Sequence, residues 1–521
     1  MNRISKKIPA VIVAVLLLFA TSLARSQELS IEDLQFGTNP SNSPLADFLS
    51  GIPGNNANQV SVGIALENLC GQIISESTPL VPEIFNIFDV CFGVFGPVLA
   101  ALGPGDTGFA QFVQNNASLL LGASGQEVAA MANSFTQLTP ASGIAAMERL
   151  NKLRLAQAGS PTEQAIAFNA RTGKLTMGLG SGGGAGDVFN EGWRFYVNGD
   201  ASTGKKDPTE LVTGYDLNGL SLDAGGDYRV DPNRFVGFNI AAREAKLDYV
   251  NESTAEVSTY DISGYGLWFM KDDWYVQGNA GIGTSQIDLT RQLEFSSRSV
   301  VIVLPDGTTF FDPSSPRKRI VSEFDSGTNA SRLFATLGAG RDFHNGPLTI
   351  GISGMFDYLD VNVDGYREHS NNFGGIPLEL EINDYSHESI RFIGGVDISR
   401  AMSTSYGVIS PFARGQWIHE FKDEPTTITA RFAGDPFSVG FKQNNLFYSG
   451  GIPAVDPATG VPDPTTFTIT SDALDTDYFQ FTTGVSAVLK GGIQAFVSVD
   501  MLVGLRDFSR YTLRAGISKE L

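Results

Sequence analysis

Apolar and polar residues alternate along this chain from Trp193 to its C-terminal end, in segments of roughly 10 to 17 residues. In residues 236–243, for example, Val, Phe, Ile and Ala alternate with Gly, Asn, Ala and Arg. Successive side chains of a β-strand point to opposite faces, so this period gives each segment one apolar face. Most strands of soluble proteins are shorter, whereas strands that cross a bilayer need this length. We therefore predict an all-β transmembrane barrel over residues 193–521.

The segments predict about 12 antiparallel strands. Their expected starting points are near residues 193, 212, 234, 256, 273, 331, 347, 388, 406, 476, 492 and 509. Every second connection is short, and three of the others are long, at 291–330, 362–387 and 422–475. Short turns at one end and long loops at the other are typical of outer-membrane barrels, whereas a soluble β-sandwich would not separate its loops in this way. We expect the short turns on the periplasmic side.

The first 26 residues have the three parts of a secretory signal peptide. Arg3, Lys6 and Lys7 precede an apolar run over residues 8–20, and small residues flank Arg25 before the expected cut. The run is shorter than the roughly 20 residues that a membrane-spanning helix needs, so we expect cleavage rather than an anchor. Removal of four basic residues and no acidic ones takes the formal net charge from −20 to about −24. Such a chain repels phosphates, so we expect no nucleic acid partner.

Residues 27–158 have a helical period instead. The spacing predicts a helix over residues 141–158, where Ile144, Met147 and Leu150 fall on one face. Residues 159–192 contain the sequence SGGGAG and predict a flexible linker, which is also a candidate lumen segment. A small, mainly α-helical region therefore precedes the barrel.

Cys70 and Cys91 are the only cysteines of the chain. Exported proteins meet an oxidising compartment, so the pair predicts one disulfide. A metal site or a redox site is the weaker interpretation, because no histidine lies nearby in the sequence and the spacing is not C-x-x-C.

Residues 186–207, 215–244 and 258–291 share a pattern of glycine, aromatic and polar positions, for example GDVFNEGWRFYVNGDASTGKKD. With these stretches, residues 186–521 resemble the autotransporter β-domain of type V secretion. Residues 128–154 are similar to the segment that precedes such barrels. The resemblance implies a twelve-stranded barrel at the surface of a Gram-negative cell, with a helix that threads the pore before the first strand.

The resemblance also implies partners. These are outer-membrane lipid, and, during biogenesis, periplasmic chaperones and the barrel assembly machinery; the partner of the N-terminal region stays unknown. The family usually ends in an aromatic residue, whereas this chain ends in Leu521.

The polar faces of the predicted strands supply candidate lumen-facing residues of both signs. These are Arg194, Asp223, Asn239, Arg243, Asp261, Gln277, Asn279, Arg391, Asp397, Arg414, Asp500 and Arg514. They fit either a hydrated conduit or ion pairs around a plug, and the sequence does not separate the two.

The predicted helix at 142–157 is a candidate plug because it carries Arg149, Lys152 and Arg154. Our hypothesis is that this helix, or the segment 161–171, occupies the lumen. The expected acidic partners of its basic side chains are Asp223, Asp261, Asp397 and Asp500.

We find no catalytic motif. The sequence has neither G-x-S-x-G nor H-E-x-x-H, and the Gly105-Asp106-Thr107 string lacks the serine of lipase-type passengers. His369, His387 and His419 are expected at the long-loop side and could form a metal or omptin-like protease site, although solvated histidines are more common. We expect no enzyme activity and no cofactor.

Two functions therefore remain open. In the first, the barrel anchors or translocates the helical N-terminal region, which acts as an interaction or surface module. In the second, the barrel itself is the functional element, as a channel, an adhesin or a surface hydrolase that uses its long loops.

Overall fold

The structure is a computed structural model, and it describes most of the region from Trp193 onwards together with parts of the N-terminal region. The described residues are 57–63, 65, 123–137, 141–158, 165–169, 174–178, 193–298, 300–303, 309–311, 317–370, 378–433, 466–489 and 493–520. The predicted signal peptide, Cys70 and Cys91 lie outside these residues.

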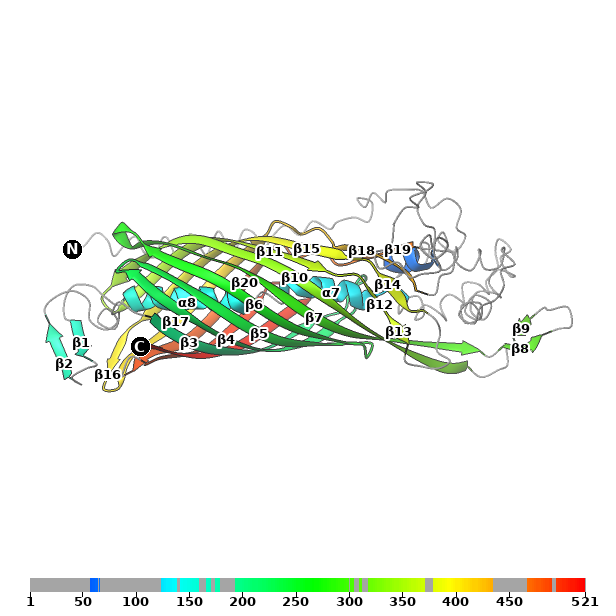
Figure 1. The fold of residues 1–521 in the computed structure, drawn as a ribbon, viewed down its shortest axis with the longest axis horizontal. Helices are drawn as coiled ribbons and strands as arrows, with labels where there is room; N and C mark the ends of the chain where they lie inside the picture. The colour runs from blue at the N-terminus through cyan, green and yellow to red at the C-terminus, as the bar shows by residue number, and fades with distance from the viewer. Residues whose placement is uncertain are drawn as a thin grey trace. The chain divides into compact units, whose positions relative to one another are not determined.

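Twelve long antiparallel strands form a closed barrel (Figure 1). They are β3 (Trp193–Lys206), β4 (Tyr215–Asp231), β5 (Arg234–Tyr249), β6 (Thr254–Phe269), β7 (Trp274–Arg298), β10 (Arg317–Asn345), β11 (Leu348–Val363), β15 (Tyr385–Arg400), β17 (Gly407–Glu420), β20 (Asp477–Leu489), β21 (Ile493–Val503) and β22 (Phe508–Glu520). Each strand pairs with the next, and β22 pairs with β3 in the register Ile517↔Val197. Closure leaves no unpaired sheet edge to face lipid.

The short connections are tight turns, and their sequences contain residues that favour turns. Between β4 and β5, Asp231 accepts a hydrogen bond from the Asn233 backbone N–H at 2.8 Å, which closes a turn around Pro232. Between β10 and β11, Gly346 adopts a positive φ of 60°, which a glycine tolerates without steric cost. These turns define the short-turn end of the barrel.

The opposite, long-loop end differs from the expectation in one respect. The predicted loop at 291–330 is partly strand, because β7 continues to Arg298 and β10 begins at Arg317, about 14 residues before the expected start near 331. The two strands stay paired along this length, since a two-stranded ladder satisfies its own inner backbone groups in water. Two short strands, β8 (Val300–Val303) and β9 (Thr309–Phe311), also pair within the same connection.

The other two long connections form a second, smaller sheet. It contains β12 (Tyr366–Arg367), β14 (Leu380–Ile382), β18 (Thr427–Phe432) and β19 (Thr466–Thr470) in that order. A separate short strand, β13 (His369–Ser370), pairs with β10, and β16 (Met402–Thr404) pairs with β17 at the short-turn end.

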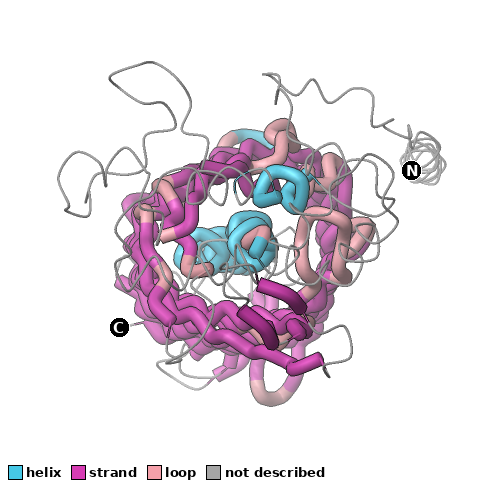
Figure 2. The backbone as a smooth tube through the Cα atoms, turned by 90° about the vertical axis from the view of Figure 1, so that its right-hand side faces the viewer, coloured by secondary structure: helices cyan, strands magenta, loops and turns pink. Residues whose placement is uncertain are grey.

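The N-terminal region contributes helices. Residues 57–63 and 65 are helical, and α7 (Gln126–Gln137) and α8 (Ala141–Ala158) follow. Figure 2 shows a helix inside the ring of barrel strands. Within the predicted linker, β1 (Ala165–Asn169) and β2 (Lys174–Gly178) form a two-stranded hairpin. No helix in the described part of the chain is long and apolar enough to cross a membrane.

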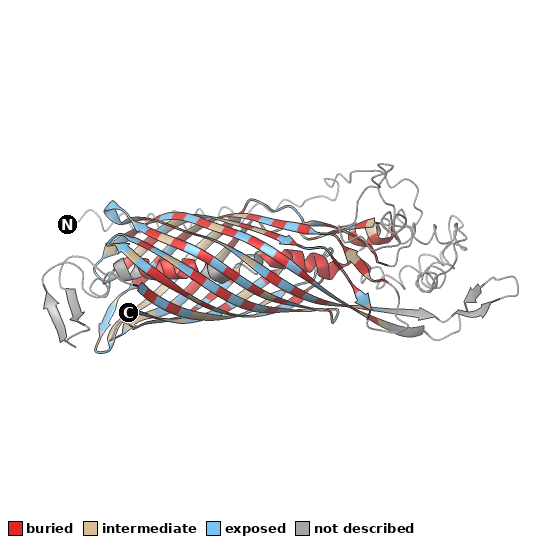
Figure 3. Cartoon of the chain, viewed as in Figure 1, coloured by how far each residue is buried: buried red, intermediate tan, exposed pale blue. Residues whose placement is uncertain are grey.

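Buried and exposed residues alternate along the barrel strands (Figure 3). On β5 the outward residues Val236, Phe238 and Ile240 are apolar and exposed, whereas Glu244 and Lys246 follow on the same face towards the long-loop end. An apolar band of limited height therefore surrounds the barrel, as lipid requires. Three of the four tryptophans, Trp193, Trp268 and Trp274, are exposed at its short-turn rim.

The band gives a direct test of the inward and outward assignments. Ala280 and Gln286 lie on the outward face of β7, Ala280 within the apolar band and Gln286 beyond it. An arginine in place of Ala280 must enter lipid, so we expect Ala280→Arg to lower the free energy of unfolding by about 2–4 kcal/mol. The matched variant Gln286→Arg should change it by less than about 0.5 kcal/mol. Urea unfolding in lipid vesicles measures both, and equal losses would contradict the assignment.

Candidate functional site: the occupied lumen

The helix α8 lies inside the barrel, where it packs against β4, β5, β6, β7 and β10. Its sequence favours a helix, because strong helix formers dominate ASGIAAMERLNKLRLAQA and Ile144 is its single β-branched residue. Its apolar face joins a buried cluster with aromatic residues of the barrel wall. The members of this cluster are Ala146, Leu150, Leu153, Tyr196, Phe235, Tyr265, Leu267 and Tyr275.

Arg149 anchors α8 to the wall near the short-turn end. Its guanidinium donates two hydrogen bonds to Asp227 Oδ2, from Nη2 at 2.7 Å and from Nε at 3.2 Å, and a third to Ser518 Oγ at 3.2 Å. Arg194 Nη2 lies 3.6 Å from the same carboxylate. Asp227 is fully buried, so these two cations compensate its negative charge inside the barrel.

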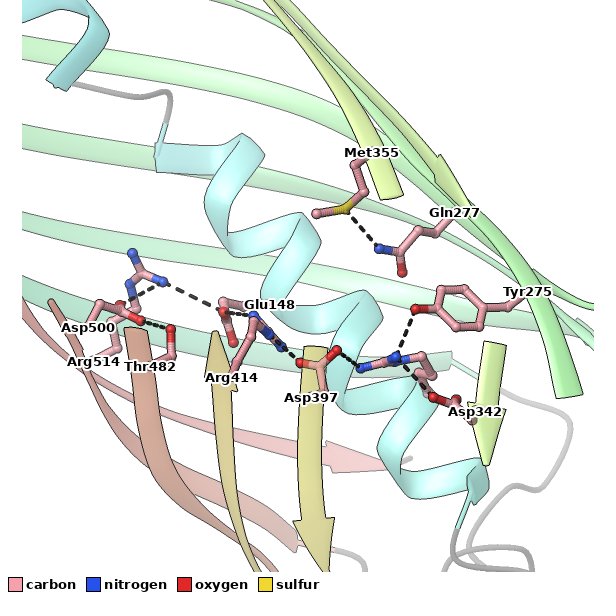
Figure 4. Close-up of polar contacts among 11 residues, drawn as sticks. Glu148, Tyr275, Gln277, Asp342, Met355, Asp397, Arg414, Thr482, Asp500 and Arg514 are labelled. Carbon is pink, nitrogen blue, oxygen red and sulfur yellow. Dashed lines mark hydrogen bonds and ion pairs between the residues drawn. The ribbon is translucent and has the colours of Figure 1, made fainter. Parts of the chain in front are cut away.

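Arg154, one helical turn and a half further on, makes a second anchor with two acidic partners. Its Nη1 lies 3.0 Å from Asp342 Oδ1 and its Nη2 lies 2.8 Å from Asp397 Oδ2, and Nη1 also donates to the Tyr275 hydroxyl at 2.7 Å (Figure 4). The Arg154 side chain has no exposed area. Gly351 makes this approach possible, because a Cβ at that position would lie 2.6 Å from both Arg154 Nη1 and Asp342 Oδ1.

Each arginine also stacks on a tyrosine of the wall. The Arg149 guanidinium lies 5.2 Å from the ring centre of Tyr196, and the Arg154 guanidinium lies 5.0 Å from that of Tyr275. A cation over an aromatic face gains electrostatic energy, and more when water is excluded. The two anchors therefore combine an ion pair and a cation–π contact.

Glu148 is an acidic residue on another face of α8, and it contacts basic residues of the wall. Its Oε1 lies 3.0 Å from Arg414 Nη1 and 3.7 Å from Arg514 Nη1 (Figure 4). Arg414 also pairs with Asp397, and Arg514 pairs with Asp500 at 3.1 Å. Charges of both signs on the helix thus meet opposite charges on the wall.

The structure places all the candidate lumen-facing residues named from the sequence at buried positions. Their exposed fractions are at most 9% for Arg194, Asp223, Asn239, Arg243, Asp261, Gln277, Asn279, Arg391, Asp397, Arg414, Asp500 and Arg514. Several also bond to one another across neighbouring strands, as Asn239 does to Asp223 at 3.0 Å.

The expected acidic partners of the plug helix are confirmed for Asp397, whereas Arg149 and Arg154 also pair with two acids that were not expected, Asp227 and Asp342. Of the four acids expected, only Asp397 pairs with a described arginine of α8; Asp223 bonds to asparagines, Asp261 lies 4.0 Å from Arg332, and Asp500 pairs with Arg514. The acids that a helix contacts inside a barrel depend on how far the helix is inserted and how it is rotated. The alternation of residues along a strand gives no information on either. The side chain of Lys152 lies outside the described residues.

The acids that do pair were present in the sequence. Asp227 lies an even number of residues from Asp223 on β4, and Asp342 lies an even number from Arg332 on β10. Each pair therefore shares the inward face of its strand, which the alternation of the sequence predicts. Asp227 and Asp342 lie close to the short turns, as Asp397 does, whereas Asp223, Asp261 and Asp500 lie further along their strands.

The helix α7 closes the long-loop end. Residues 123–135 are buried on every side, among apolar residues of the extended barrel strands and of the small sheet. Its polar residues reach the long-loop connections: Gln126 donates to the Glu210 backbone oxygen at 3.3 Å, and Glu127 accepts hydrogen bonds from Asn251 and Ser253.

A buried ion pair lies beside α7. Arg291 donates to Glu368 from Nε at 2.8 Å and from Nη2 at 2.6 Å, and both side chains have no exposed area. Burial raises the pKa of the nearby Glu127 carboxyl, although the Arg291 charge opposes the change. The buried charges beside α7, at the long-loop end, are therefore also compensated.

His369, His387 and His419 do not belong to a metal-binding group within the described residues. His387 is buried and shares a hydrogen bond of 3.1 Å with Thr426. His419 lies 3.0 Å from Asp477. Within the described residues, no group of three or more His, Cys, Asp or Glu side chains could hold a metal ion.

Comparison with known protein families identifies the barrel. Residues 195–452 match the family model described as the autotransporter β-domain, a range that runs from β3 through β17, the ninth barrel strand, and into the connection after it. No curated protein sequence is similar enough to match this chain.

Solved structures with a similar fold include two autotransporter domains. The translocator domain of the autotransporter NalP from Neisseria meningitidis has 9% sequence identity and a TM-score of 0.44, over 63% of this chain and 89% of that one. The β-domain of the Bordetella autotransporter BrkA has 12% identity and a TM-score of 0.39, over 63% of this chain and 100% of that one.

The arginine anchors predict a large effect of a single substitution. Arg154→Ala leaves Asp342 and Asp397 buried with fewer cations, so we expect the free energy of unfolding to fall by about 3–5 kcal/mol. Lys246→Ala removes an exposed ion pair with Asp248 and should cost less than about 1 kcal/mol. Urea unfolding of both variants measures this difference. If Arg154→Ala costs no more than Lys246→Ala, α8 is not held in the way described.

Proposed function

The barrel of this chain is a member of the autotransporter β-domain family, and we propose that it anchors its own N-terminal region at the outer surface of the cell. The observation that carries the proposal is the direction of the chain through the barrel. Residues before α8 contact the long-loop end, and the last turns of α8 contact the short-turn end.

The contacts of the two helices support this direction. Gln126 and Glu127 of α7 bond to the β3–β4 and β5–β6 connections at the long-loop end. Arg154 of α8 bonds to Asp342 and Asp397, which precede short turns. The chain thus enters the lumen from the long-loop side and leaves it where β3 begins. In outer-membrane barrels, the long loops face the exterior.

The helical residues 57–63 extend these contacts to the edge of the small sheet. The Asn58 side chain donates to the Thr470 backbone oxygen at 2.9 Å and accepts from the Thr470 backbone N–H at 2.7 Å. Ser61 Oγ accepts a hydrogen bond from the Thr468 backbone N–H at 2.9 Å. The N-terminal region therefore covers an edge strand that would otherwise expose unpaired backbone groups.

A barrel that is filled by α8 and covered by α7 fits an anchor better than an open channel. Export by a cleaved signal peptide and passage through periplasmic chaperones and the barrel assembly machinery are further parts of this proposal. The N-terminal region acts in it as a surface interaction module without enzymatic activity.

Epitope tags on intact cells test the proposal. A tag placed after residue 27 should bind antibody on whole cells, as should tags near residues 310, 375 and 450, whereas a tag in the turn at His344-Asn345-Gly346 should bind only after permeabilisation. The turn tag is the control for an intact membrane. A tag after residue 27 that stays hidden while the long-loop tags are reached would place the N-terminal region in the periplasm and refute the proposal.

A further inference from the structure

A cavity of about 120 Å³ remains between α8 and part of the barrel wall. The helix side contributes Gly143, Met147, Glu148 and Asn151, and the wall side consists of residues from β10, β11, β15, β17, β20, β21 and β22. The volume exceeds the roughly 10–15 Å³ that one water molecule requires, so the cavity can hold a small solute with its first partners.

Arginine dominates the charged lining of this cavity. The charged lining residues are Arg391, Arg414, Arg510, Arg514, Glu148 and Asp357. Two further acids, Asp397 and Asp500, pair with Arg414 and Arg514 but do not line the cavity. The surface that faces the cavity therefore presents four guanidinium groups and only two carboxylates.

The two lining carboxylates are already shared among arginines. Asp357 accepts a hydrogen bond from Arg391 Nε at 3.1 Å, and Glu148 lies within 3.0 Å of Arg414 and 3.7 Å of Arg514. Each guanidinium carries five N–H donors and no acceptor, so N–H donors outnumber carboxylate acceptors among the charged groups that line the cavity. Tyr478, which also lines it, accepts from Arg391 Nη1 at 3.4 Å and keeps its own O–H to donate.

From this arrangement we infer that the cavity binds a small anion, either a halide or a tetrahedral oxyanion. Asp397 and Asp500 lie behind Arg414 and Arg514, but the charged surface of the cavity itself is rich in N–H donors, which favours an occupant that offers acceptors. Guanidinium groups suit oxyanions in particular, because their planar forks match two oxygens at once. The bound anion would lie against α8, on the face of the helix that carries Glu148. The inference is independent of which side of the membrane the N-terminal region occupies.

Anomalous diffraction from crystals of the full chain tests the site. One set of crystals is soaked with bromide in place of chloride, and a second set with selenate. We expect an anomalous peak within hydrogen-bonding distance of at least two of the four arginines in at least one set. A peak with bromide alone identifies a halide site, and a peak with selenate identifies an oxyanion site. Absence of a peak in the cavity from both sets would overturn the inference.

A charge variant makes the test specific. Gln480 lines the cavity from β20, so Gln480→Glu adds a carboxylate to it. We expect the anion concentration for half occupancy to rise by at least about tenfold. The matched control Gln286→Glu lies on the outward face of β7 and should leave the occupancy unchanged. If Gln480→Glu fails to fold, Gln416→Glu places the same charge in the cavity from β17. An unchanged peak in the folded cavity variant would contradict the assignment.

Discussion

The compensation of buried charge inside a closed barrel is the constraint on which the rest of this structure depends. The outward face of each strand must be apolar because it meets lipid, so the polar residues of the chain collect inside. An uncompensated charge there would cost several kcal/mol. The helix α8 meets the requirement with Arg149, Arg154 and Glu148, each of which contacts an opposite charge on the wall. The lumen and its helix are therefore one electrostatic unit.

The same constraint acts differently at the two ends of the barrel. Near the short-turn end, two arginines of α8 reach acids on several strands. At the long-loop end the closure is mainly apolar, with α7 packed into a core that the small sheet completes. Only one buried ion pair, Arg291–Glu368, is described beside α7 there. Ion pairs therefore hold α8 near the short-turn end, and apolar packing of α7 covers the long-loop end.

The barrel could be predicted from the sequence because the alternation of apolar and polar residues is a local property of each strand. The sequence predicted the inward set, from Arg194 to Arg514, for the same reason. It did not predict which acids Arg149 and Arg154 meet, because that depends on how far α8 is inserted and how it is rotated. Nor did it predict the length of β7 and β10, since paired strands outside lipid need no apolar face. Local periodicity thus gave the architecture, and the contacts between distant elements needed the structure.

The conductance of the barrel with and without its helix tests the central claim most directly. Planar-bilayer recordings can compare the mature protein with a shortened protein that begins near Gly182 and lacks α7 and α8. Because α8 fills the lumen and pairs with its charges, the account predicts a clearly larger single-channel conductance for the shortened protein. Equal conductance in the two proteins would contradict it, since the helix would then lie outside the path of the ions.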